Sequence, residues 1–554
     1  MTPRHTAAVG LVGALVTAAV LVTGAGQKFY PDDPIWRDPE TQDASDVEPV
    51  DLSQQYDFIE NTFLDAGDET PRRALNVNTV GEVPDSSWFT NRIGRDHWPV
   101  DRLVRGPNQG TGPAEGSWTI VGGKSEGITP GLTIRDSAGD TYFIKFDPPD
   151  YPEMASGAEL ISTKLFHAFG YNTPENYLAT LRRESLSIDP KTRIDDRDGR
   201  PRPMTPRDLD TLLKKVARHP DGSYRVVASK ALPGRPVGHF RYYGTRPDDP
   251  NDIFPHEHRR ELRGLSVFAA WLNHDDSRSI NTLDVLVNEN GRSRVRHYLL
   301  DFGSTLGSGS TQAQTTRAGN EYIWEARPTL LTMLTLGFYV RPWVRVPYPD
   351  IPAAGRIEST YFRPENWKPE YPNPAFANAR PEDRFWAARI VSRFSDADIR
   401  AIVEAARFTD QRATDYLTEV ILARRAKVLM TWLNATNPVI NVSLDDDGRL
   451  RFANAAEQVG MGKPADRYTL AWSRFDNVAS THTPVGAAQD VSTPSGQAPR
   501  ELLDSPFIAV TIRAFDPDHP AWQQPLVAFF RRAPDGSWSL VGLERGAAGP
   551  AKTE

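Results

Sequence analysis

The sequence contains no cysteine. Without a thiol the chain can form no disulfide, bind no metal through thiolates, use no cysteine nucleophile and carry no lipid on a cysteine. It also lacks the hydrolase motifs G-x-S-x-G and H-E-x-x-H, so a hydrolase function has little support. If the protein works outside the cytoplasm, its stability must come from its hydrophobic cores.

The chain also lacks an excess of positive charge. Among its 554 residues, 64 lysines and arginines stand against 72 aspartates and glutamates, which gives a formal net charge of -8. A nucleic-acid-binding surface normally requires a basic excess, so we expect no nucleic-acid partner. Apolar residues make up 39% of the chain and aromatic residues 10%. This composition predicts a globular protein, and the length suggests about three or four domains.

Residues 7–26 form an uncharged, mostly apolar run behind a short start that carries Arg4. About 20 such residues are long for a cleaved signal and about right for one membrane span, so residues 1–26 are either a signal peptide or a retained anchor. Positive charge precedes the run and acidic sequence follows it. This order predicts that the bulk of the chain is extracytoplasmic, in the periplasm or cell envelope, or secreted.

Two motifs in the middle of the chain suit phosphate chemistry. The segment His274–Asn281 has the spacing H-x-D-x-x-x-x-N, and Asp301–Gly303 is an Asp-Phe-Gly tripeptide that closes an apolar strand. Residues 283–300, between the motifs, are patterned as a β-hairpin. Such a hairpin would place Asn281 beside Asp301, where one metal ion could contact both side chains.

In this order, the two motifs resemble the catalytic loop and the metal-binding loop of the protein-kinase-like superfamily. The resemblance covers roughly residues 116–436. It implies that ATP and Mg²⁺ (or Mn²⁺) are the cofactors. It further implies that Asp276 is the catalytic base and that Asn281 and Asp301 bind the metal.

The kinase pattern is incomplete in three places. The chain has no G-x-G-x-x-G motif and no A-P-E motif, and Asp275 stands where kinases mostly carry arginine. These departures indicate an atypical branch, for which toxin-type serine kinases and spore-coat or secretory-pathway kinases are nearer models than signalling kinases. With the apolar N-terminal run, we expect an exported bacterial member of that branch.

A glycine-rich stretch follows the first of three predicted strands, which span residues 118–121, 132–136 and 141–146. In a kinase-like fold this stretch would cover the nucleotide phosphates, so the resemblance makes Gly122, Gly123 and Gly127 candidate phosphate-binding residues. An ordinary glycine-rich hairpin explains the stretch almost as well. Farther along, Leu232 lies in a predicted hinge after the strand 224–230, and strand and hinge would supply the adenine contacts.

Lys145 ends the third of these strands, and Glu159 lies early in a helical pattern over residues 155–169. These positions match the family's strand lysine, which pairs with the α- and β-phosphates and with a helix glutamate. The resemblance therefore adds Lys145 and Glu159 to the candidate catalytic residues. The alternatives are a solvated lysine at a strand end and a first-turn glutamate favoured by the helix dipole.

The segments around these motifs complete the predicted organisation. Residues 27–115 are rich in Pro and Asp and predict an extended arm, whose aromatic segment 81–89 docks on the next domain. Residues 304–317, rich in Gly, Ser and Thr, are patterned as a mobile substrate loop. His256 and His258 would face apart on a helix, so we expect surface residues and not metal ligands. Further helices are predicted at residues 206–217, 257–273, 329–336, 381–394, 396–406 and 411–433.

The predicted fold class is α+β: a two-lobed protein-kinase-like fold with an extended N-terminal arm and a C-terminal all-β, sandwich-like domain. The predicted units are the leader 1–26, the arm 27–115, an N-lobe 116–235, a helical C-lobe 236–436 and the β domain 437–554. The predicted function is ATP- and Mg²⁺-dependent phosphate transfer to a hydroxyl of a protein, glycan or small molecule in the cell envelope. The alternative is a pseudokinase that serves as an envelope scaffold or binding module.

Overall fold

The computed structural model describes residues 26–64, 66–123, 130–196 and 199–546. The apolar run that was predicted as signal or anchor lies almost entirely outside this range, and so does the candidate phosphate-binding residue Gly127. Among the helices within this range, none combines the length and the apolar character needed to cross a membrane.

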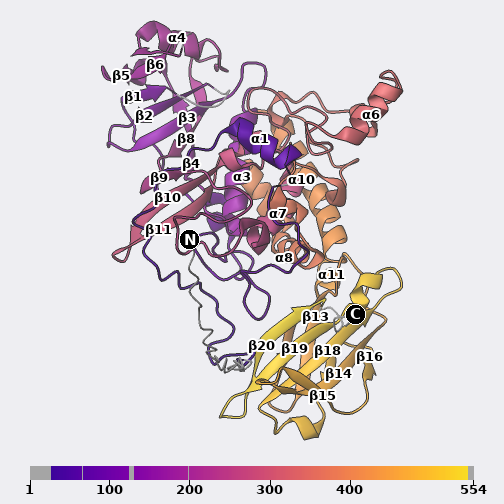
Figure 1. The fold of residues 1–554 in the computed structure, drawn as a ribbon. Helices are drawn as coiled ribbons and strands as arrows, with labels where there is room; N and C mark the ends of the chain where they lie inside the picture. The colour runs from indigo at the N-terminus through magenta and orange to yellow at the C-terminus, as the bar shows by residue number, and fades with distance from the viewer. Residues whose placement is uncertain (1–25, 65, 124–129, 197–198, 547–554) are drawn as a thin grey trace, which may run out of the picture.

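The described chain is a mixed α+β structure in which a sheet domain, a helical region and a C-terminal β domain follow one another (Figure 1). The first domain contains a six-stranded sheet. From edge to edge its strands are β4 (Asn176–Leu181), β8 (Tyr224–Lys230), β3 (Thr141–Phe146), β2 (Gly131–Arg135), β1 (Trp118–Gly123) and β5 (Leu186–Ile188). The three strands predicted from alternating apolar residues are present, at β1, β2 and β3.

Helix α3 (Met154–Phe169) packs against this sheet, and all but one of its 16 residues are buried. Two sides of the helix are covered at once, by the sheet and by the helical region, which explains why its burial extends beyond the apolar stripe seen in the sequence. The helix ends at Gly170, whose φ of 134° is accessible to glycine. A Cβ at Gly170 would lie 2.2 Å from the ring of Phe89, so this end of the helix is also a site of close packing.

The segment 182–223, between β4 and β8, is an insertion that extends the sheet domain. It contributes the edge strand β5, which pairs in parallel with β1, and a small hairpin of β6 (Arg193–Asp195) and β7 (Pro201–Pro203). Its helix α4 (Pro206–Leu213) begins with a capping box and buries Leu209 and Leu213 in the same core as the sheet. The insertion is therefore part of the folded sheet domain.

A second, three-stranded sheet connects the sheet domain to the helical region. Its order is β11 (Arg292–Leu299), β10 (Thr282–Glu289) and β9 (Arg235–Gly238). The predicted hairpin is present as β10–β11, with Thr282 opposite Leu299. Asn290 and Gly291 form its turn with φ of 54° and 77°, a conformation that asparagine and glycine tolerate best.

The helical region is built around α5 (Arg260–Leu272), whose apolar side chains lie in one continuous core with those of the later helices. Five of the predicted helices are found in this region, with ends shifted by a few residues. The helices after α5 are α6 (Ala326–Leu334), α7 (Pro374–Ala377), α8 (Pro381–Val391), α9 (Asp396–Glu404) and α10 (Gln411–Trp432).

The prediction that His256 and His258 are surface residues is wrong, because both are buried just before α5. Nε2 of His256 lies 2.7 Å from a carboxylate oxygen of Asp252. Nε2 of His258 lies 3.2 Å from Asp68 of the arm. Asp252 is only four residues from His256, whereas Asp68 lies 190 positions from His258 and could not be inferred as its partner from local sequence.

The N-terminal arm is more ordered than predicted. It contains two helices, α1 (Gln54–Phe63) and α2 (Val100–Arg105). Trp88 docks as expected, but on the helical region and the second sheet: its ring stacks on His297 at 3.5 Å. The arm also reaches the other end of the molecule, where Phe29 is buried in the C-terminal domain.

The C-terminal domain consists of two facing antiparallel sheets. The smaller contains β12 (Val439–Leu444), β13 (Arg449–Asn454) and β17 (Ser495–Gln497). The larger contains β15 (Thr481–Pro484), β14 (Arg467–Asp476), β18 (Phe507–Phe515), β19 (Leu526–Arg532) and β20 (Trp538–Arg545), with β16 (Gln489–Val491) beside β14. A short helix, α11 (Ala455–Gln458), follows β13. Phe452 and Tyr468 meet between the sheets at 4.9 Å, so these aromatic residues form a core.

Candidate active site

Three residues from separate elements meet at one ammonium group. Lys145 lies in β3, the third strand from the β4 edge of the six-stranded sheet, opposite Gly131 and Val227. Its Nζ is 2.9 Å from Oε2 of Glu159 on α3 and 2.9 Å from Oδ1 of Asp301 after β11. The structure therefore brings together three of the residues that the sequence singled out, although 156 positions separate Lys145 from Asp301.

Burial tends to lower the pKa of Lys145, but the carboxylates of Asp301 and Glu159 outweigh it and hold that pKa above its ordinary value. Lys145 is therefore a cation at neutral pH. A fixed ammonium at the end of a strand suits the binding of phosphate oxygens. The solvated lysine considered from sequence does not fit these contacts.

Glu159 is buried and has a second partner. Its Oε1 accepts a hydrogen bond of 2.9 Å from Nδ2 of Asn176, at the start of β4. The same amide donates to Oγ1 of Thr163, one turn farther along α3. A buried carboxylate needs such partners, because an uncompensated one costs several kcal/mol. Sequence reasoning missed Asn176, since nothing in its local pattern marks it.

Asp301 has a left-handed backbone, with φ of 56° and ψ of 59°. This conformation is uncommon outside glycine and is best tolerated by asparagine and aspartate. The next residue, Phe302, is fully buried and stacks on Phe166 of α3 at 4.7 Å. The buried ring fixes the backbone that aims the Asp301 carboxylate at Lys145. A strained residue held in this way is typical of functional sites.

Asn281 lies at the predicted position beside the Asp301 segment. Its backbone carbonyl accepts a hydrogen bond of 2.8 Å from the amide of Leu300, the residue before Asp301. Its Nδ2 donates to the backbone carbonyl of Asp276 at 2.8 Å. Asn281 and Asp301 thus offer amide and carboxylate oxygens from adjacent strand ends, which are ligands of the kind that Mg²⁺ prefers.

Such a metal would have few protein ligands. Within the ranges that the structure describes, no group of three or more histidines, aspartates or glutamates is arranged to hold a metal ion. A pair of oxygen ligands fits Mg²⁺ or Mn²⁺ in a nucleotide site, since phosphate oxygens and water complete the coordination there.

Asp276 lies in residues 274–281, which we call the candidate catalytic loop, and its side chain is 14% exposed. Its carboxylate forms an ion pair with Arg278, whose guanidinium also lies 3.1 Å from Glu370. Burial raises the pKa of Asp276 to about 7, with Arg278 opposing the shift and Glu370 adding to it. A carboxylate that titrates near neutrality can accept a proton at physiological pH. Arg278 and Glu370 were not identified from the sequence.

Asp275, the neighbour of Asp276, has a different environment. Its carboxylate accepts a hydrogen bond of 2.6 Å from Nε2 of Gln314, and its backbone carbonyl accepts one of 2.8 Å from the amide of Glu370. Burial holds the pKa of Asp275 well above its usual range, and the charge of Glu370 acts in the same direction. Asp275 therefore fastens the candidate catalytic loop to two later segments.

The loop after Asp301 is packed, contrary to the mobile loop that its composition predicted. Thr305, Ser308 and Gln314 are buried. Oγ1 of Thr305 is 2.7 Å from Oγ of Ser162 on α3. Small polar residues are common in mobile loops, but here their hydroxyl and amide groups find buried partners.

His274 supports the site without reaching it. Burial lowers its pKa to about 4, with the charge of Asp301 opposing the shift. The neutral ring packs against Phe166 at 5.7 Å and Phe302 at 5.8 Å. Its contribution is the packing that joins the candidate catalytic loop to the Asp301 segment.

The candidate nucleotide-binding residues lie in different kinds of element, some in a strand and one in a connection. Gly122 and Gly123 are the last residues of β1, opposite Thr133 and Leu132, with a register shift after Ile120. The expectation that they belong to a loop is therefore wrong, because the β1–β2 ladder extends through them. Leu232 is half-buried in the connection between β8 and β9.

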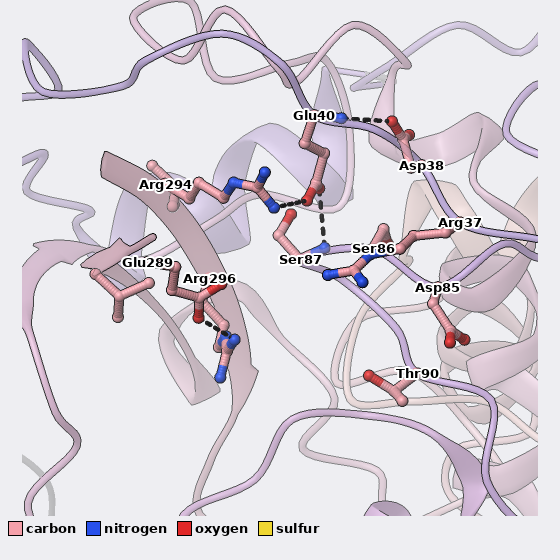
Figure 2. Close-up of a pocket in the computed structure, with 12 residues that line it drawn as sticks. Arg37, Asp38, Glu40, Asp85, Ser86, Ser87, Thr90, Glu289, Arg294 and Arg296 are labelled. Atoms are coloured by element: carbon pink, nitrogen blue, oxygen red, sulfur yellow. Dashed lines mark hydrogen bonds and ion pairs between the residues drawn. The ribbon is translucent and has the colours of Figure 1, made fainter. Parts of the chain in front are cut away.

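Two cavities are found away from these residues. The first, of about 250 Å³, lies between the arm and the β10–β11 hairpin (Figure 2). Two of its three arginines are neutralised there, Arg294 by Glu40 at 3.6 Å and Arg296 by an ion pair with Glu289. Glu40 also accepts a hydrogen bond of 2.9 Å from the amide of Ser87. These contacts attach the arm to the hairpin. The second cavity, of about 420 Å³, lies against α5, α7 and the segment 364–369.

Comparisons with known proteins show a similarity in structure. No family model matches the chain, and a search of curated proteins finds no match. Among solved structures, the chain is similar to the crystal structure of the Golgi casein kinase with Mn/ADP bound. The identity is 12%, the TM-score is 0.30, and the alignment covers 72% of this chain and 93% of that one. A TM-score this low leaves the function to be inferred from the geometry of the chain itself.

Proposed function

We propose that the protein is an atypical, two-lobed kinase that transfers the γ-phosphoryl group of ATP to a hydroxyl acceptor. The observation that carries this proposal is the contact of Lys145 with both Glu159 and Asp301, each bond being 2.9 Å. The kinase resemblance implies the pairing of the strand lysine with the helix glutamate, and the contact with Asp301 adds the carboxylate that the resemblance assigns to the metal. The sheet domain and the helical region would be the two lobes, with the site between them.

The described residues would divide the work as follows. Lys145 would bind phosphate oxygens, and Glu159, held by Asn176, would keep the ammonium in place. Asn281 and Asp301 are the residues that would hold Mg²⁺ or Mn²⁺. When bound, the metal would supply the charge neutralisation that phosphoryl transfer needs.

Asp276 would act on the acceptor. In the transfer, the acceptor oxygen forms a bond to the γ-phosphorus while the bond from that phosphorus to the β–γ bridging oxygen breaks, so that ADP leaves. The hydroxyl proton passes to the Asp276 carboxylate. A pKa of about 7 makes that carboxylate available at neutral pH, and Arg278 orients it.

A second candidate function is a nucleotide-binding pseudokinase that serves as a scaffold. The observation in its favour is that the carboxylates proposed to act on metal and acceptor are already engaged, Asp301 with Lys145 and Asp276 with Arg278. An enzyme would have to exchange part of these ion pairs for nucleotide, metal and acceptor.

Two assays on the full chain separate these functions. Nucleotide binding would be measured with Mg²⁺, with Mn²⁺ and with chelator. Transfer would be followed from ATP labelled on the γ-phosphate, with the protein itself or an envelope extract as acceptor. Metal-dependent binding with transfer is the result expected of a kinase. Metal-dependent binding without transfer to any acceptor would establish the scaffold, and the absence of nucleotide binding would exclude both.

The compartment is also a proposal. From the charge order around residues 7–26, we place the remainder of the chain outside the cytoplasm. A tag at the C-terminus should then be digested by external protease in intact spheroplasts. Protection of the tag in spheroplasts, with digestion after lysis, would contradict this placement.

A further inference from the structure

The segment 323–344 exposes an unusual amount of apolar surface. Among the residues that the structure describes, ten of the 24 exposed large apolar side chains lie in these 22 positions. They are Ile323, Trp324, Leu330, Met333, Leu334, Leu336, Phe338, Tyr339, Val340 and Val344. Leu336 and Phe338 are each 86% exposed. An apolar patch of this kind on a folded protein marks an interaction surface.

The patch is carried by an element that does not pack on the core. Helix α6 lies within the segment, and none of its nine residues is buried. Figure 1 shows α6 standing out from the helical region, away from the C-terminal domain. Trp324, at the start of the segment, contacts Phe63 at 5.2 Å, but the exposed side chains of and after α6 are presented to the surroundings and are available to a partner.

The charges around the patch favour an anionic partner. Arg327 and Arg345 are exposed. The nearby carboxylates of Glu321 and Glu325 are each held in an ion pair, so they do not offset these two cations. This local positive excess, in a chain of net charge -8, complements a negatively charged surface.

We propose that the segment 323–345 binds the surface of an anionic lipid bilayer. Exposed Trp, Tyr, Phe and Leu beside arginine is the composition of a membrane–water interface, where aromatic rings sit at headgroup level and guanidinium groups meet lipid phosphates. At ~1.5 Å per residue, nine residues of helix span about 14 Å, which is short of the ~30 Å hydrocarbon core. The segment therefore lies in the interface.

An independent feature of the sequence points to the same partner. The apolar run 7–26 suits either export or anchoring, and an anchored chain would hold segment 323–345 close to a bilayer. The segment also begins beside the candidate active site, since the amide of Ile323 donates a hydrogen bond to the carbonyl of Glu370, which pairs with Arg278. Lipid binding by the segment does not depend on the proposed kinase function.

The lack of cysteine allows a direct test on the full chain. A single cysteine introduced by Phe338→Cys would carry an environment-sensitive fluorophore. Val478→Cys, in the C-terminal domain and 64% exposed, is the matched control. Both native side chains are exposed, so neither change should disturb folding. Each labelled protein would be incorporated into vesicles that contain a lipid with a brominated acyl chain. The vesicles would be made of phosphatidylcholine, with and without phosphatidylglycerol.

We expect the label at position 338 to shift to shorter wavelength and to be quenched severalfold more than the label at position 478. The quenching should be stronger with phosphatidylglycerol and weaker at high salt. Equal quenching at the two positions, or equal quenching with and without phosphatidylglycerol, would overturn the proposal. A blue shift that grows with protein concentration and needs no lipid would overturn it in favour of a contact between two copies of the chain.

Discussion

Asp57 of the N-terminal arm accepts, through Oδ1, a hydrogen bond of 2.9 Å from the hydroxyl of Ser279 in the candidate catalytic loop. Its Oδ2 accepts one of 2.5 Å from the hydroxyl of Tyr371, and the carboxylate is fully buried. Helix α1 is thereby attached to the loop that carries Asp276 and Asn281. The arm is a structural part of the candidate active site.

This contact predicts that Asp57→Asn destabilises the protein. The amide would place an N–H group against one of the two hydroxyl donors and leave a buried polar group unsatisfied, at a cost of about 1–3 kcal/mol. Thermal unfolding of the variant should therefore shift to lower temperature. The control is Asp504→Asn, because Asp504 is a surface residue whose side chain is 99% exposed. Identical unfolding of the two variants would show that the arm contact is dispensable.

Lys145→Ala should weaken nucleotide binding. It removes one charge-assisted contact to phosphate, which corresponds to roughly 1.5–3 kcal/mol, or about ten- to a hundredfold in affinity. Lys230→Ala is the matched control, because Lys230 lies on the neighbouring strand β8 and pairs with Asp140 at the surface. Titration with nucleotide and Mg²⁺ would give both affinities. Equal affinities of the two variants for the nucleotide would show that Lys145 does not bind it.

Asp301→Asn should abolish the part of nucleotide binding that depends on metal. Asparagine tolerates the left-handed backbone at this position, so the change removes the negative charge without adding strain. The measurement is nucleotide affinity with Mg²⁺ or Mn²⁺ and with chelator. Wild type should show a difference between the two conditions and Asp301→Asn should not. A variant that keeps the wild-type response to metal would disprove the assignment.

Asp276→Asn should separate turnover from binding. A general base contributes about 10²–10⁴-fold, so phosphate transfer should fall by that order while nucleotide affinity stays nearly constant. If Asp276 only caps a turn, the change should cost about 1 kcal/mol of stability and have no selective effect on rate. Equal transfer by the two proteins would contradict the assignment of Asp276 as the base.

The pKa of Asp276 also predicts how transfer depends on pH. Only the ionised carboxylate can accept the proton, and burial raises its pKa to about 7. The rate should therefore fall as pH drops through about 7, approaching tenfold per unit below it. In Asp276→Asn the residual rate should lose this dependence. A wild-type rate that stays flat between pH 5 and 8 would mean that another group accepts the proton.

Local patterns in the sequence were enough to predict the strands β1 to β3, helix α3, the β10–β11 hairpin and the main helices, because periodicity and turn residues act over short distances. They also identified Lys145, Glu159 and Asp301 as candidates. Their meeting at one ammonium group is a result of the tertiary structure, since three elements must pack before the ion pairs can form.

Other features were decided by the tertiary structure alone. Helix α1 was missed because it buries polar residues, Asp57 and Asn61, and so has no apolar stripe to mark it. His258 was expected at the surface and is buried beside Asp68 of the arm, 190 positions earlier. The pKa of Asp276 depends on Glu370, a residue 94 positions later. In each case the deciding partner lies far away in the chain, and burial and charge act through space and not along the sequence.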